Sequence, residues 1–288
     1  MLVEYGMLFA FLFLLFNQIG NIPIRRLAVA YGSAMTSFIL VLAGIAPLLV
    51  GVYIFGAFSI TQYSLFVSVI AGIFFAFGYL FFYKTIESEL LSSSAGLFAI
   101  QPALLFIFGV LVLGESITLF DVFGTVLVLV GVAFITKKKD SFHINKAFAY
   151  GIIGNVFWTV YWILTSYAIQ SVSQPVLQLT ISRVVGCVII GLAVLLTMKA
   201  VRKEYRQKVL AKPRLFYIAN SAGVINGLST MFFALVIVLK FLAIGSIITA
   251  LGPALLAIFV IIIYKERPER MRIMGIAIAV IGALLIAL

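Results

Sequence analysis

One stretch of this chain decides its fold, because it occurs twice. Residues 101–135 read QPALLFIFGVLVLGESITLFDVFGTVLVLVGVAFI, and residues 252–287 read GPALLAIFVIIIYKERPERMRIMGIAIAVIGALLIA. Sliding residues 71–137 by 151 positions lays them on residues 222–288 without a gap. A match of this length predicts an internal repeat. Its most informative coincidences are Pro102 with Pro253, Glu115 with Glu266, Gly124 with Gly275, and Gly131 with Gly282.

The composition around this repeat is that of a membrane protein. Of 288 residues, 64% are hydrophobic and only 10% are charged, whereas soluble domains carry about 25% charged residues. A bilayer core needs about 20 helical residues per crossing. On that basis we predict an all-α integral membrane protein with ten transmembrane helices, at residues 4–22, 33–56, 62–83, 90–113, 118–136, 147–169, 175–198, 215–239, 243–264 and 270–288.

Each repeat holds five of these helices, so the second repeat must cross the membrane in the opposite sense. We therefore predict two inverted five-helix repeats, residues 1–137 and 147–288, joined by a basic linker at residues 138–146. Many transporters have this arrangement, with the substrate site near the midplane between the halves.

The formal charge of +11 could suggest nucleic-acid binding, but its distribution does not. Nearly all Lys and Arg residues fall in loops on one side of the predicted membrane, which is the pattern that orients membrane proteins. We therefore predict a multi-pass protein of the cell membrane with membrane lipids, and no nucleic acid, as partners. The basic loops 137–146 and 199–214 are expected in the cytoplasm and both termini outside.

The repeated stretch resembles the fourth and fifth helices of an EamA module. The resemblance rests on a Pro entering the helix, on LGE at residues 113–115, and on two Gly spaced seven apart; the second copy has YKE at the LGE position. Two such modules in tandem resemble the drug/metabolite transporter superfamily over essentially the whole chain. The resemblance implies a ten-helix transporter of small metabolites, in a superfamily that moves amino acids, sugars, nucleotide sugars and drugs.

Arg183 is the first candidate for substrate binding, because it lies well inside the span 175–198. A cation at that depth is costly and usually faces a cavity or a partner. It could be the counter-charge for a carboxylate or phosphate, or a structural residue bonded to backbone carbonyls. Asn155, Trp158, Trp162 and Ser166 share one helical face of the sixth span, where they could line a cavity or anchor the helix in lipid.

Further polar residues inside the spans are weaker candidates for the same site. They are Asn17 and Gln18, Tyr79 and Tyr83, Gln101, Gln178, Asn220, Asn226 and Thr230. Pro102 and Pro253 should kink their helices. These paired kinks would shape the cavity or act as gating hinges, or would serve helix packing alone.

We predict a secondary transporter that moves small organic metabolites by alternating access, with amino acids or other carboxylated solutes favoured. An enzyme, a cofactor and a metal site are not expected, because the chain has one His, one Cys and no acidic residue in the centre of a span. Three alternatives remain: a flippase for lipids or lipid-linked sugars, an exporter of drugs or organic cations, and a membrane receptor that transports nothing. A monomer is plausible.

Overall fold

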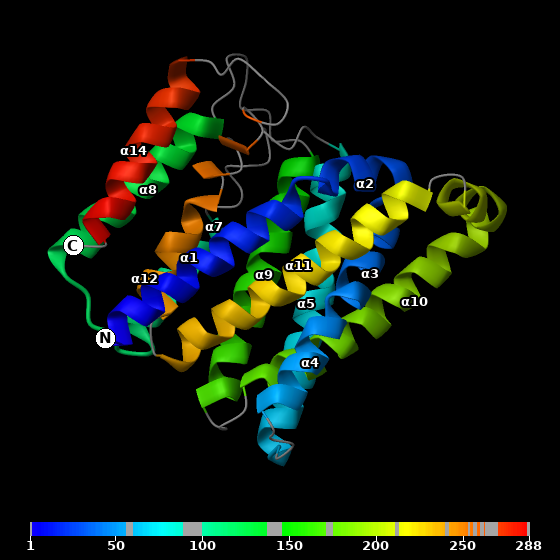
Figure 1. Ribbon diagram of the computed structural model, residues 1–288, viewed down its shortest axis with the longest axis horizontal. Coiled ribbons are helices and arrows are strands. Elements are labelled where there is room, and N and C mark those ends of the chain that lie inside the picture. Colours follow the sequence, from blue (N-terminus) through cyan, green and yellow to red (C-terminus); the bar gives the residue numbers. More distant parts are fainter. Residues whose placement is uncertain are drawn as a thin grey trace.

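All regular secondary structure in the described part of the computed structural model is α-helical (Figure 1). The structure describes residues 2–55, 60–88, 100–136, 146–170, 175–210, 213–239, 242–252, 254–255, 258–259, 262 and 270–286. Each of the ten predicted spans contains a described helix. The protein is an all-α integral membrane protein.

The first half contains the helices α1 (Leu2–Asn21), α2 (Ile24–Tyr31), α3 (Ser33–Ala43), α4 (Ile45–Phe55), α5 (Gln62–Ser88), α7 (Ile100–Leu111) and α8 (Leu119–Thr136). The second half contains α9 (Lys146–Gln170), α10 (Pro175–Leu210), α11 (Pro213–Val238), α12 (Leu242–Ala250) and α14 (Arg270–Ile286). Six stretches within the described residues are long and apolar enough to cross a membrane: Glu4–Tyr31, Ser33–Ile54, Gln62–Ile86, Ala149–Ile169, Pro175–Leu196 and Pro213–Val238.

The structure differs from the predicted spans in three places. Helix α2 occupies a segment predicted as a loop; it is short and amphipathic, with Arg25 and Arg26 exposed, so a search for long apolar runs misses it. The second span is divided at Gly44 into α3 and α4. Helix α10 continues to Leu210, through most of the predicted loop 199–214, because Lys, Arg, Glu and Gln have high intrinsic helix propensity.

The two halves pack as a pair related by an approximate two-fold axis. Helix α5 packs on α9 as its counterpart α11 packs on α1, and α7 packs on α9 as α12 packs on α1. Other contacts join counterparts directly, namely α8 with α14 and α7 with α12. In Figure 1, α1 runs opposite to α11 and α8 runs opposite to α14. This is the arrangement expected of inverted repeats.

The repeated glycines show the same symmetry where α8 crosses α14. A Cβ atom on Gly131 would lie 2.6 Å from the carbonyl oxygen of Gly275, and one on Gly282 would lie 2.7 Å from the carbonyl oxygen of Gly124. The second glycine of each repeat (Gly131 or Gly282) therefore meets the first glycine of the other repeat (Gly275 or Gly124). Small residues at such crossings let two backbones approach closely in a membrane, so these positions hold the two halves together.

Candidate functional site

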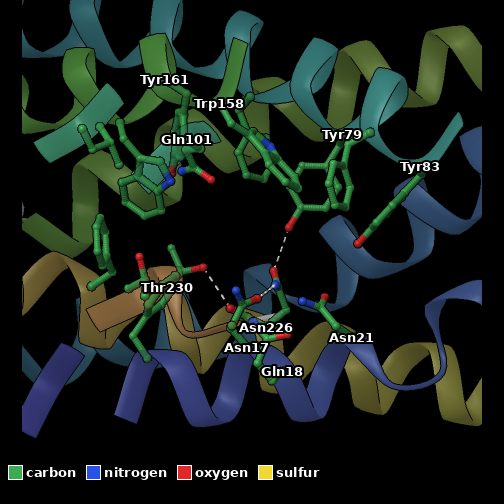
Figure 2. Close-up of a pocket in the computed structure, with 18 residues that line it drawn as sticks. Asn17, Gln18, Asn21, Tyr79, Tyr83, Gln101, Trp158, Tyr161, Asn226 and Thr230 are labelled. Carbon is green, nitrogen blue, oxygen red and sulfur yellow. Dashed lines mark hydrogen bonds between the residues drawn. The ribbon is translucent and has the colours of Figure 1, made fainter. Parts of the chain in front are cut away.

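A cavity of about 90 Å³ lies between the two halves (Figure 2). Three helices of the first half (α1, α5 and α7) and their three counterparts in the second half (α9, α11 and α12) line it. The cavity is large enough for several water molecules or for part of a small solute. Its position between equivalent helices is where inverted-repeat transporters bind substrate.

One side of the cavity is polar and is built by the packed pair α1 and α11. The residues of this amide wall are Asn17, Gln18 and Asn21 from α1 and Asn226 and Thr230 from α11. They form the lower side of the cavity in Figure 2. Asn226 Nδ2 donates to Asn17 Oδ1 at 3.3 Å, which joins the two helices through their side chains.

The opposite side is aromatic and is built by the packed pair α5 and α9. Tyr79 meets Trp158 edge-on with 5.3 Å between ring centroids, and the rings of Phe82 and Trp158 are 4.4 Å apart. Edge-on and tilted contacts of this kind hold aromatic side chains in fixed orientations. The residues of this aromatic wall are Phe75, Tyr79, Phe82, Tyr83, Trp158, Tyr161 and Trp162.

Arg183 of α10 lies directly behind the amide wall and does not line the cavity. Its side chain is only 1% exposed. Its Nη2 donates to Asn226 Oδ1 at 2.7 Å, its Nη1 to Thr230 Oγ1 at 3.2 Å, and its Nε to the carbonyl oxygen of Val41 at 3.2 Å. The guanidinium also lies 5.7 Å from the ring centroid of Phe75, within cation–π range. In the described part of the chain no carboxylate pairs with it.

The structure brings most of the predicted binding residues together. The cavity is lined by nine of them: Asn17, Gln18, Tyr79, Tyr83, Gln101, Trp158, Trp162, Asn226 and Thr230. Asn155 and Gln178 lie outside the lining, in contacts between helices. Asn155 Nδ2 donates to the carbonyl of Gly151 in its own helix, and Gln178 Oε1 accepts from the hydroxyl of Ser68.

The predicted hinges are only partly within the described residues. Pro102 is the third described residue of α7, and the residues that precede α7 lie outside the described part of the chain. Pro253 lies outside the described residues. The gating role of the two prolines therefore stays a prediction. Glu115, which also coincides between the repeats, accepts a hydrogen bond from the backbone N–H of Leu242 at the start of α12.

Several lining residues were missed from the sequence. Asn21 had a usable signal, since it lies one helical turn after Asn17 on the same face of α1. Phe75, Phe82 and Phe233 had none, because an aromatic side chain that faces a cavity has the same sequence pattern as one that faces lipid. Tyr161 lies one residue from the predicted face of α9 and was missed for that reason.

Comparison with known proteins agrees with this architecture. The model of the EamA-like transporter family matches residues 4–137 and again residues 145–288. No curated protein matches the chain. A solved structure described as "Crystal structure of protein" shares the fold, with a TM-score of 0.71 and 16% sequence identity over 99% of this chain and 98% of that one. The chain belongs to the EamA-like transporter family.

Proposed function

We propose that this membrane transporter of small solutes carries carboxylated metabolites, amino acids among them, by alternating access. The observation that supports the proposal is the chemistry of the cavity. Its amide wall has the buried Arg183 directly behind it, and its aromatic wall faces that polar surface. Among the described residues that line the cavity none is acidic. A solute with a carboxylate at one end and an apolar body at the other fits these two walls.

Electrostatics favours an anionic group over a cationic one. Arg183 is held by neutral acceptors, so its positive charge is not cancelled by a carboxylate in the described part of the chain. In a medium of low dielectric constant such a charge acts over several ångströms and attracts an anion to the amide wall. An organic cation meets the same field as repulsion, which disfavours the drug-exporter alternative.

The two-fold arrangement supports a mechanism of alternating access. The six helices that line the cavity are three from each half and lie in equivalent places. Rocking of one half against the other would open the cavity first to one side of the membrane and then to the other. Nothing in this mechanism requires bond-making chemistry, which agrees with a transporter rather than an enzyme.

Counterflow in proteoliposomes tests the proposal. Vesicles loaded with unlabelled solute would be diluted into labelled zwitterionic amino acids, organic anions or organic cations. Saturable accumulation of a carboxylated solute, absent from protein-free vesicles, is expected. Accumulation restricted to organic cations would contradict the substrate class, and no exchange of any solute would favour a receptor that transports nothing.

The orientation proposed from the basic loops can be tested separately. A single cysteine placed within residues 199–214 should react with a membrane-impermeant maleimide only after the cytoplasmic side is opened. The one native cysteine, Cys187, is buried and gives little background. Reaction from the outside of intact cells would reverse the proposed topology.

A further inference from the structure

Arg183 does not line the cavity, but it is hydrogen-bonded to residues that do. Within the described residues its three hydrogen bonds go to acceptors fixed by the protein: Val41 on α3, and Asn226 and Thr230 on α11. Val41 lies near the end of α3, which ends at Ala43. The guanidinium is thus anchored at one end to the first half and at the other to the amide wall, so it reaches a solute only through its neighbours.

The chemistry of arginine fixes which way the Asn226 amide faces. An arginine side chain can only donate hydrogen bonds, so the atom of Asn226 that meets it must be Oδ1. That oxygen accepts from Arg183 Nη2 at 2.7 Å and from Tyr79 Oη at 2.8 Å, which uses both of its lone pairs. Asn226 can therefore present only its NH₂ group to the rest of the wall.

The orientation of the Asn226 amide in turn fixes the orientation of the Asn17 amide. Asn226 Nδ2 donates to Asn17 Oδ1, so the amide nitrogen of Asn17 is left facing away from Asn226. Asn17 lines the cavity, and in the described part of the chain its Nδ2 has no acceptor. Figure 2 shows Asn17 and Asn226 side by side at the lower wall, with Tyr79 above them.

We propose that Arg183 is a positioning residue that aligns Asn226 and Asn17, so that the Asn17 amide nitrogen donates to an acceptor group of the substrate. The alignment turns two neutral amides, each able to donate or accept, into a surface that only donates. A carboxylate has acceptors alone and fits it, whereas an ammonium group has donors alone and does not. This inference rests on the proposed function and names the atom that selects the carboxylated solute.

Asn17→Asp tests the donor directly, because it exchanges that NH₂ group for an oxygen and still leaves Asn226 an acceptor. Binding of labelled L-phenylalanine, L-leucine and their decarboxylated amines, phenethylamine and isopentylamine, would be measured by scintillation proximity. In Asn17→Asp we expect affinity for the two amino acids to fall about tenfold or more and affinity for the amines to rise. Asn220→Asp makes the same change on α11 outside the cavity, where Asn220 donates to the carbonyl of Phe216, and should leave all four affinities unchanged.

Asn226→Asp tests the alignment. The new carboxylate keeps both donors, Arg183 and Tyr79, but cannot donate to Asn17, whose amide becomes free to turn. We expect the preference for amino acid over amine to shrink towards one, while a purely structural role would lower both affinities by the same factor. Melting temperatures of both variants, compared with Asn220→Asp, show that the fold is retained.

The outcomes separate this inference from the proposed function. If the wild-type protein binds none of the four solutes, the proposed function fails and the inference with it. If the wild-type protein prefers the amino acids and Asn17→Asp keeps that preference unchanged, the carrier function stands and the alignment is refuted. Inverted preference in Asn17→Asp together with lost preference in Asn226→Asp supports both.

Discussion

The two walls of the cavity stand on equivalent helices of a repeated fold, yet their chemistry is opposite. In the register of 151 residues that aligns the repeats, Asn226 of the amide wall corresponds to Phe75 of the aromatic wall, and Thr230 corresponds to Tyr79. The two residues of each pair occupy equivalent places in the two halves. The duplicated backbone therefore forms the cavity, and substitutions at matched positions give that cavity a polar side and an apolar side.

The crossing of α8 and α14 shows what happens where the repeats have stayed alike. There Gly124 and Gly131 meet Gly275 and Gly282 in matching contacts. Helix approach there requires small residues from both copies, whereas the cavity can hold a solute with two different ends only if the copies differ. Symmetry thus serves assembly of the halves, and its loss serves recognition.

The largest effect is expected from making the two walls alike. Asn226→Phe places the residue of the first repeat into the second and leaves the buried Arg183 without its shortest hydrogen bond. Overpacking and the unsatisfied donor together should cost about 2–5 kcal/mol in stability. Transport of carboxylated solutes, measured by counterflow, should be lost, and the melting temperature should fall. Normal transport in this variant would contradict the role of the amide wall.

Truncation of the aromatic wall should have a smaller and more selective effect. Trp158→Ala removes ring contacts with Tyr79 and Phe82. Aromatic pairs contribute about 0.5–1.5 kcal/mol beyond burial, so affinity for L-phenylalanine should fall about threefold to tenfold and affinity for L-leucine should fall less. Competition binding with the two amino acids checks this. An equal loss for both would mean that Trp158 shapes the wall without contacting the solute.

A change at the edge of the amide wall should affect stability more than binding. Thr230→Val keeps the size of the side chain and removes the acceptor of Arg183 Nη1. We expect a loss of about 1–2 kcal/mol in stability, read as a lower melting temperature, with affinity for amino acids changed by no more than about threefold because Asn226 keeps its own bond to Arg183. A larger loss of affinity would show that Thr230 contacts the solute.

The smallest effect is expected outside both walls. Asn155 is buried, donates to Gly151 in its own helix, and has a side-chain oxygen without a partner in the described structure. Asn155→Leu should leave binding unchanged and should preserve or slightly raise the melting temperature, because it removes a buried unsatisfied atom. A clear loss of binding would show that Asn155 belongs to the site and extends the wall formed by α5 and α9.

The sequence was enough to predict the helical membrane fold and the repeat, because both depend on patterns that lie along the chain. Long apolar runs and the shared Pro, Glu and Gly positions are visible without coordinates. Helix α2 and the extension of α10 were not predicted, since neither is an apolar run of membrane length. Where a helix leaves the bilayer depends on its surroundings, and hydropathy does not record this.

The site could be predicted only in part, for a related reason. Polar residues inside apolar helices are rare enough to attract attention, so Asn17, Asn226 and Thr230 were found. The position of a polar residue within a span did not show which way its side chain points. Asn155 and Gln178 point into contacts between helices, and Arg183 lies one layer behind the cavity. The aromatic residues that line the cavity share their pattern with those facing lipid, and only the helix arrangement separates them.

The most direct test of a carboxylate site between the two walls uses the protein's own tryptophans. The chain has two, Trp158 and Trp162, and both line the cavity. Their fluorescence in purified protein would be titrated with amino acids and with the corresponding amines. We expect a saturable change in fluorescence with the carboxylated solutes, and Asn226→Phe should abolish it. No change with any carboxylated solute, or an equal response to the amines, would contradict a carboxylate site between the two walls.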